Sequence, residues 1–479
     1  SAVTAFEVMK YDYEDLYAAK KTYGQDINTS LGNAADPIDA DQKLQEDALM
    51  SYVASVNYSY DDKYYASFSF RRDGSSRLSP DTRWGNFWSL SASWRLSQER
   101  FMQPLKSVLS DLKLRASYGV NGNLPSSYYG YQSTYTTGAF YSGKPSPWES
   151  TLGNEELTWE KNYALNLGLD IGLFSRVNVS LDWYTRTTKD LLMSKQLNSI
   201  SGFSSLLTNV GQMRNTGVEL EVRSNNIKTK DFSWTTAFNL SHNKNKILKL
   251  ADLPWFVDGR YVRKEGYPFN TIYLREYAGV DPETGSALYY DNQQDENGNY
   301  TKNKVTDPGQ ASPIPLKDIT PTISGGFMNT FNYKFIDLSF NLSYSFGGYS
   351  YDNASYILQD DGYSVISNKS TEQRRRWQKP GDITDVPRFV YGNKKGGNYN
   401  SSRAIHSTDH IRLKSLILGL NAPKAWLQKL GIGNARIYFS GTNLLTWAAY
   451  GQYDPEMSGV VGFYTPPLKT YAFGLELKF

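Results

Sequence analysis

Residues 470–479 of this chain read TYAFGLELKF, and the fold class is best approached from this stretch. Large apolar side chains occupy every second position: Tyr471, Phe473, Leu475, Leu477 and Phe479. A period of two is the period of a β-strand, so one face is apolar and the other is small or charged. Such a strand suits a membrane barrel with lipid on one side and water on the other, or a soluble sandwich that buries one face. This stretch alone leaves both architectures open.

The composition is compatible with a β-barrel and argues against a protein that spans the membrane with helices. Aromatic residues make up 15% of the 479 residues, as expected where aromatic girdles meet two membrane interfaces. The mean hydropathy is −0.55, and no apolar run approaches about 18 residues, so we expect no transmembrane helix. A barrel keeps a low mean hydropathy because its strands alternate apolar and polar residues.

Several sites and partners are not expected from these residues. There is no cysteine for a disulfide or a thiolate metal site, and a net charge of +3 gives no basis for binding nucleic acid. The three histidines, His242, His406 and His410, are too scattered to predict a metal site, and no cofactor is expected. The first residues, SAVTAFEVMK, have none of the features of a signal peptide. We therefore expect either a mature chain or one that begins in mid-protein.

Strand patterns of nine to fourteen residues recur along the whole chain, which is longer than the usual five or six residues of soluble strands. A tilted membrane strand needs about nine to eleven residues, so the lengths favour a bilayer. The fourteen predicted strands cover residues 2–10, 51–60, 63–72, 86–96, 111–121, 160–173, 175–187, 214–224, 231–243, 320–333, 335–347, 409–421, 434–447 and 470–479.

Shorter and longer connections alternate between these strands, with one near-tie between 73–85 and 97–110. Outer-membrane barrels place short turns in the periplasm and long loops outside the cell. The sequence thus predicts one all-β domain over residues 1–479, a transmembrane antiparallel β-barrel. Its predicted long extracellular loops lie near 11–50, 122–159, 188–213, 244–319, 348–408 and 448–469.

The amino-acid sequence of several segments resembles the C-terminal half of a SusC-like (SusC/RagA family) TonB-dependent outer-membrane transporter of Bacteroidetes. The segments are SFRRDGSSRLSPDTRWGNFWSLSASWRLS from Ser69, LSDLKLRASYGVNGN from Leu109, LGNEELTWEKN from Leu152, NVGQMRNTGVELEV from Asn209, NIKTKDFSWTTAFNLSHNKNKI from Asn226 and YFSGTNLLTW from Tyr438. They are long, ordered and spread over nearly the whole chain, which makes the resemblance specific.

The resemblance implies a barrel of 22 strands, of which this chain would supply about 14 C-terminal ones. The plug domain, the TonB box and the first strands are absent and are expected in an N-terminal remainder of the transporter. The implied partners are a SusD-like surface lipoprotein that forms a lid, TonB in the periplasm, and the lipid and lipopolysaccharide of the outer membrane. The implied function is active import of oligosaccharides. The alternatives are import of oligopeptides by the same mechanism, a passive porin-like channel closed by 14 strands, and a soluble carbohydrate-binding β protein.

Candidate substrate contacts are aromatic residues in the predicted loops, because flat rings stack on sugars. They are Tyr128, Tyr129, Tyr131, Tyr135, Trp148, Tyr351 and Trp377. The alternative is that these rings pack the loops against their neighbours. The resemblance also implies that Tyr471, Phe473, Leu475, Leu477 and Phe479 form the strand recognised by the barrel-assembly machinery.

Two further loop features have simple alternatives to a binding role. The stretch DENGN at 295–299 resembles part of a calcium loop, but it lacks the expected acidic ligands and is interpreted as a polar hairpin tip. The run Arg374, Arg375 and Arg376 is either a contact for lipopolysaccharide or lid carboxylates, or a solvated loop. No catalytic motif is found, so no enzyme activity is expected.

Overall fold

The computed structural model describes residues 1–24, 30–250, 253–393, 400–423, 426–427 and 431–479. Fourteen strands form one antiparallel sheet in the order β1-β2-β3-β4-β5-β8-β9-β12-β13-β21-β22-β25-β26-β28. Every predicted strand has a counterpart in this sheet, so the fourteen-strand prediction is confirmed. The bounds are β1 Ala2–Tyr23, β2 Ala34–Tyr60, β3 Tyr64–Ser75, β4 Trp84–Arg95, β5 Leu109–Asn123, β8 Glu160–Leu173, β9 Val177–Lys189, β12 Gln212–Lys228, β13 Phe232–Lys249, β21 Ile323–Tyr333, β22 Ile336–Phe346, β25 His410–Asn421, β26 Asn434–Ala448 and β28 Thr470–Lys478. No helix among the described residues is long and apolar enough to cross a membrane.

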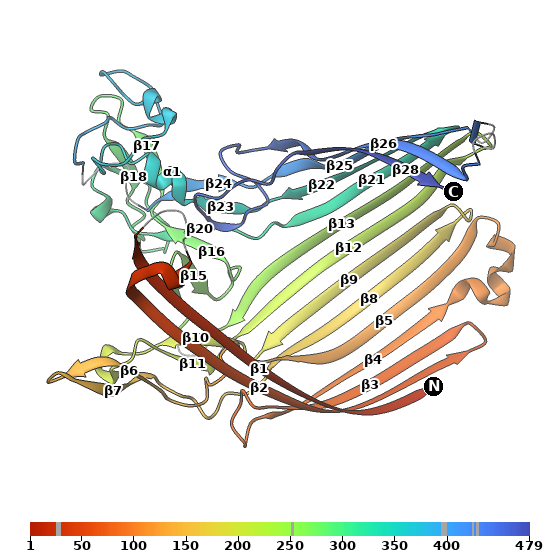
Figure 1. Cartoon of the computed structure of the whole chain (residues 1–479), viewed down its shortest axis with the longest axis horizontal. Coiled ribbons are helices and arrows are strands. Elements are labelled where there is room, and N and C mark those ends of the chain that lie inside the picture. The colour runs from red at the N-terminus through yellow and green to blue at the C-terminus, as the bar shows by residue number, and fades with distance from the viewer. Residues whose placement is uncertain (25–29, 251–252, 394–399, 424–425, 428–430) are drawn as a thin grey trace. The chain divides into compact units, whose positions relative to one another are not determined.

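The chain divides into two compact units. The first comprises Ser1–Trp94, Arg115–Asn166 and Arg186–Met213, and the second comprises Arg95–Leu114, Leu167–Thr185 and Arg214–Phe479. In the second unit, β21, β22, β25, β26 and β28 lie side by side (Figure 1). The short turn at Lys334 joins β21 to β22 at one end of these strands, and the longer segments of this unit lie at the other end (Figure 1). This arrangement fits the predicted alternation of short turns and long loops.

The first predicted loop, 11–50, is largely strand, which corrects its secondary structure. β1 and β2 pair from Ala2↔Val56 to Tyr23↔Ala34, with one irregularity between Ala19 and Lys20. The stretch YDYED from Tyr11 keeps the period of two, although acidic residues take every second position. These residues are exposed, so the charges stay in water while the ladder continues.

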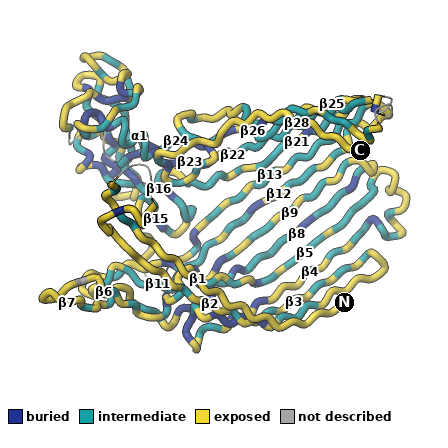
Figure 2. The backbone as a smooth tube through the Cα atoms, in the orientation of Figure 1, coloured by how far each residue is buried: buried dark blue, intermediate teal, exposed yellow. Residues whose placement is uncertain are grey.

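The other long segments carry small sheets of their own. In the first unit β6 (Thr134–Tyr141) pairs with β7 (Lys144–Thr151), and β10 (Leu192–Gln196) pairs with β11 (Ser205–Asn209). In the second unit the small sheets comprise β14 Trp255–Asp258, β15 Tyr261–Lys264, β16 Thr271–Leu274 and β20 Ile314–Asp318; β17 Tyr277–Val280, β18 Ala287–Tyr290 and β19 Lys304–Val305; and β24 Ile405–Ser407, β23 Tyr349–Asp352 and β27 Gly459–Val461. Helix α1 spans Asn353–Leu358, and 3₁₀ turns occupy Leu31–Asn33, Leu96–Gln98, Arg100–Leu105, Ser199–Ser201, Pro308–Gln310, Thr371–Arg375 and Ser402–Ala404. Buried residues gather around α1 and its neighbouring strands (Figure 2).

The predicted alternation of β28 is confirmed by its pairing with β26. Phe439 pairs with Phe473 and Ile437 with Leu475 on one side, which we call the apolar face. On the other side, the polar face, Arg436 pairs with Glu476 and Tyr438 with Gly474. The Phe473 side chain is 82% exposed, so the protein itself does not cover the apolar face here.

Two β-bulges change the alternation in β25 and β26. Lys414 has no partner on β22, where Asn341 pairs with Ser415 and Leu342 with Leu413. On β26 the two residues 443 and 444 stand opposite Lys414. A bulge inserts one residue and so reverses the side on which the following residues lie. Beyond it, Arg412 and Thr446 lie on the polar face.

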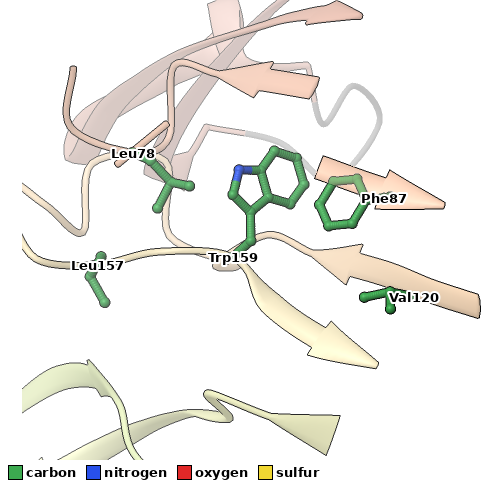
Figure 3. Close-up of a cluster of buried hydrophobic side chains, with 5 residues drawn as sticks. All are labelled: Leu78, Phe87, Val120, Leu157 and Trp159. Atoms are coloured by element: carbon green, nitrogen blue, oxygen red, sulfur yellow. The ribbon is translucent and has the colours of Figure 1, made fainter. Parts of the chain in front are cut away.

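A buried cluster in the first unit consists of Leu78, Phe87, Val120, Leu157 and Trp159 (Figure 3). The Trp159 ring meets the Phe87 ring edge-on, with 5.1 Å between centroids, and its Nε1 donates to the carbonyl of Arg83 at 2.8 Å. Leu192 of β10 and Leu207 of β11 pack against the cluster. It therefore anchors the β10–β11 hairpin to the ends of β4, β5 and β8.

Candidate functional site

A row of ion-paired side chains, which we call the ion-pair ladder, extends across the polar face of β22, β25, β26 and β28. Arg436 donates to both carboxylate oxygens of Asp337, at 3.1 and 2.6 Å, and Asn421 donates to the same carboxylate at 2.8 Å. Glu476 lies 3.6 Å from the Arg436 guanidinium. Gly419 leaves the necessary space, because a Cβ there would lie 2.5 Å from Asp337 Oδ1. This ladder gives the polar face fixed hydrogen-bonding groups.

Uncharged groups extend the polar face on β9, β12 and β13. The Tyr184 hydroxyl donates to Asn243 Oδ1 at 3.1 Å, and the amides of Asn243 and Asn245 donate to Asn215 Oδ1. Asn245 Oδ1 in turn accepts from the backbone N–H of Phe269 at 2.7 Å. Amide and hydroxyl groups of this kind bind neutral polar ligands without attracting counterions.

Three predicted aromatics, Tyr128, Tyr129 and Tyr131, contact the protein itself. The Arg77 guanidinium lies 4.2 Å from the Tyr128 ring centroid and binds Asp47 at 2.7 Å. The hydrogen bond to Asp47 raises the pKa of Arg77. The Tyr129 hydroxyl accepts from a backbone N–H of β2 at 3.2 Å, and Tyr131 packs against the buried cluster. These contacts attach the segment to β2, and substrate contact by the three rings stays a prediction.

Tyr135 and Trp148 lie on the β6–β7 hairpin, and both side chains are exposed. The neighbouring Phe140 and Tyr141 are exposed as well. The hairpin therefore presents four rings to solvent, which is the arrangement that a stacking surface needs. Substrate contact by Tyr135 and Trp148 also stays a prediction.

Tyr351 and Trp377 lie in loop segments of the second unit and are held by packing. Tyr351 is 1% exposed; its hydroxyl donates to Asn400 Oδ1 at 2.7 Å, and the Arg260 guanidinium lies 4.5 Å from its ring centroid. Trp377 Nε1 donates to the carbonyl of Pro282 at 2.8 Å. In this arrangement the Tyr351 ring has no free face, and a substrate role for either residue remains a prediction.

A cavity of about 680 Å³ lies between the polar face of β25 and β26 and the segment 451–469. Its lining includes Arg412, Asn443, Thr446, Tyr453, Phe463 and Tyr464. Sequence reasoning missed these residues because two bulges and a loop bring them together. The one available signal was the aromatic and proline content of GFYTPPLK, from Gly462.

The DENGN stretch forms a hairpin tip. Asp295 Oδ1 accepts from the backbone N–H groups of Asn297 and Asn299 at 2.9 and 2.8 Å. These backbone hydrogen bonds, chiefly that from Asn299, lower the pKa of Asp295. In the described part of the chain, no group of three His, Asp or Glu side chains is placed to hold a metal ion.

Residues 4–310 match the family described as TonB dependent receptor-like, beta-barrel. The chain belongs to this family. As a TonB-dependent receptor barrel it lies in the outer membrane, so the apolar face contacts lipid and the polar face lines the lumen. The soluble sandwich that residues 470–479 alone left open is therefore excluded.

Known relatives indicate which kind of TonB-dependent receptor this chain is similar to. TonB-dependent receptor P3 of Formosa agariphila is 31% identical over 100% of this chain and 50% of its own length. TonB-dependent receptor SusC of Bacteroides thetaiotaomicron is 31% identical over 92% of this chain and 45% of its own length. The structure of the RagAB peptide transporter superposes with a TM-score of 0.89 at 30% identity, over 100% of this chain and 53% of that one. The chain thus spans about half the length of these relatives.

Proposed function

We propose that this chain forms most of the barrel wall of a TonB-dependent importer of the SusC/RagA type, which carries oligosaccharides across the outer membrane. The observation that carries the proposal is the match to SusC and RagAB along nearly the whole chain. The partners proposed are an N-terminal remainder with the plug and first strands, a SusD-like surface lipoprotein, and TonB.

The polar and aromatic surfaces support a role in passing an oligomer. The exposed rings of the β6–β7 hairpin offer stacking surfaces for sugar rings outside the membrane. The Asp337–Arg436–Glu476 ladder and the Asn215–Asn243 amides then offer hydrogen-bond partners along the lumen. Energy for transport would come from TonB acting on the N-terminal remainder.

Oligopeptides are the second candidate substrate, and one observation favours them. The structures with the high TM-scores at about 30% identity are those of a peptide transporter. A barrel wall and aromatic rings suit either oligomer, so the substrate has to be identified by binding and uptake.

The test uses the intact transporter with its lipoprotein, in cells and in detergent. Uptake of labelled neutral oligosaccharides and of labelled peptides of similar length is compared with and without a protonophore. We expect oligosaccharide uptake that the protonophore abolishes and that Tyr135→Ala with Trp148→Ala reduces. Uptake of peptides alone would refute the glycan assignment, and protonophore-insensitive uptake would indicate a passive channel.

A further inference from the structure

We propose that the 680 Å³ cavity at segment 451–469 binds a short neutral stretch of the transported glycan, whose hydroxyl oxygens accept hydrogen bonds from Arg412 and Tyr453. This inference rests on the proposed import function and names a binding subsite within it. The volume falls in the range of about 300–1,000 Å³ that is typical of ligand sites.

Two buried donor atoms, in residues that line the cavity, lack a hydrogen-bond acceptor among the residues that the structure describes. Arg412 is 3% exposed and its Nε has no hydrogen-bond acceptor; the Tyr453 hydroxyl is also buried and has no acceptor at hydrogen-bond distance, with Ser350 as its polar neighbour. Leaving such a group unpaired costs about 1–3 kcal/mol. Burial raises the pKa of Tyr453 to about 12, so its hydroxyl keeps the proton that it would donate. Both groups can therefore donate a hydrogen bond to an acceptor oxygen of a ligand in the cavity.

The charges beside these donors are already balanced. Arg412 Nη1 donates to Glu456 at 3.0 Å and Nη2 to Asp454 at 2.7 Å, while Lys414 Nζ lies 2.6 Å from Glu456. Two cations therefore face two carboxylates. An acidic ligand would meet both carboxylates at short range, so a neutral ligand is favoured. Lys469 also lines the cavity, but it is exposed and its attraction is weakened by water and salt.

The opposite wall supplies apolar surface. Phe463 and Tyr464 are both exposed, and Pro466 and Pro467 follow them along the lining. Asn443 and Thr446 add polar groups from β26. A sugar unit has an apolar C–H face and a rim of hydroxyls, which matches the rings on one side of the cavity and the donors of Arg412 and Tyr453 on the other.

The experiment measures ligand binding by the intact transporter–lipoprotein complex in detergent, by titration calorimetry. The probes are neutral gluco-, manno- and fructo-oligosaccharides, uronic-acid oligosaccharides, and uncharged peptides of similar length. Tyr453→Phe removes only the buried hydroxyl, and Phe463→Ala removes an exposed ring. Tyr391→Phe removes a hydroxyl from an exposed loop tyrosine and is the matched control.

We expect Tyr453→Phe to weaken binding of the best neutral oligosaccharide about two- to tenfold, the effect of one hydrogen bond. Phe463→Ala is expected to weaken it similarly, and Tyr391→Phe to leave it unchanged. If a neutral oligosaccharide is imported and both test variants bind it as tightly as wild type, the cavity is not its site although the import function stands. Binding of peptides alone would overturn both the glycan class and this subsite. Preferred binding of uronic-acid oligosaccharides would overturn the charge argument.

Discussion

The packing of Phe87 in the buried cluster predicts that Gly122→Ala destabilises the first unit. A Cβ at Gly122 would overlap the end of the Phe87 ring and lie 2.9 Å from Trp159 Cε3. A Cβ at Gly85 would overlap the same ring. Phe87 therefore lies over the backbone of two glycines with Trp159 at its edge, so the ring has little room to move.

The expected cost follows from overpacking of a buried site. Inserting one methyl group into such a core typically costs about 1–3 kcal/mol, and we expect Gly122→Ala to fall in this range. Phe87→Leu removes the ring atoms that the new Cβ would overlap. Combining it with Gly122→Ala should therefore cost less than the sum of the two single changes, by about 0.5–3 kcal/mol.

The assay is urea unfolding of the transporter in detergent micelles, followed by tryptophan fluorescence and by heat-modifiable migration on gels. Gly138→Ala is the matched control, because only Thr136 Oγ1 at 3.9 Å comes within reach of a Cβ there. If Gly122→Ala and Gly138→Ala unfold at the same urea concentration, or if the double-mutant effects simply add, the packing argument is wrong.

Three further predictions concern the loops and the last strand. The Arg403 guanidinium binds Asp361 at 2.5 and 3.2 Å, and Asp361→Asn leaves it without its buried counter-charge. This change should lower the free energy of unfolding by about 3–5 kcal/mol and speed amide hydrogen exchange in α1 and β24. The control Asp385→Asn, in the exposed pair with Arg375, should change exchange little. Burial against Tyr450, 3.7 Å away between ring centroids, lowers the pKa of His406 from 6.5, and Asp352 opposes the shift. Because the unfolded chain then binds more protons, stability should fall as the pH drops below about 6.5. Thermal melts from pH 8 to 5 should show this fall in the wild type and a smaller one in His406→Asn. Phe479→Ala should lower the amount of folded barrel in outer-membrane fractions relative to Phe463→Ala; equal amounts would contradict the predicted assembly role of the last strand.

The strands were predictable because lipid on one side and water on the other impose a strict period of two. For β8 even both bounds, 160 and 173, agree with the prediction. The extension of β1 and β2 was missed because acidic residues replace apolar ones once both faces of a hairpin meet water. The small loop sheets have short strands, whose patterns are too brief to distinguish from irregular loop.

The candidate site was less predictable than the fold. Composition alone identified loop aromatics, but it could not separate the exposed Tyr135 and Trp148 from the buried Tyr351. That distinction depends on contacts between distant residues, such as Arg260 with Tyr351. The cavity depends on a pairing of Arg412 with Asp454, more than 40 residues apart, which no local pattern encodes.

Because of the bulge at Lys414, the side on which Arg412 lies depends on the number of residues in β25. The loops around the cavity have no such constraint on their length. Between Ser415 and Asn421 the even-numbered residues, such as Leu416 and Leu418, lie on the apolar face. Arg412 is also even-numbered and lies on the polar face only because of the extra residue. Deleting Lys414 would turn a guanidinium toward lipid and Leu413 toward the lumen. Homologous barrels should therefore vary freely in the length of the segments around the cavity while conserving the number of residues inside β25.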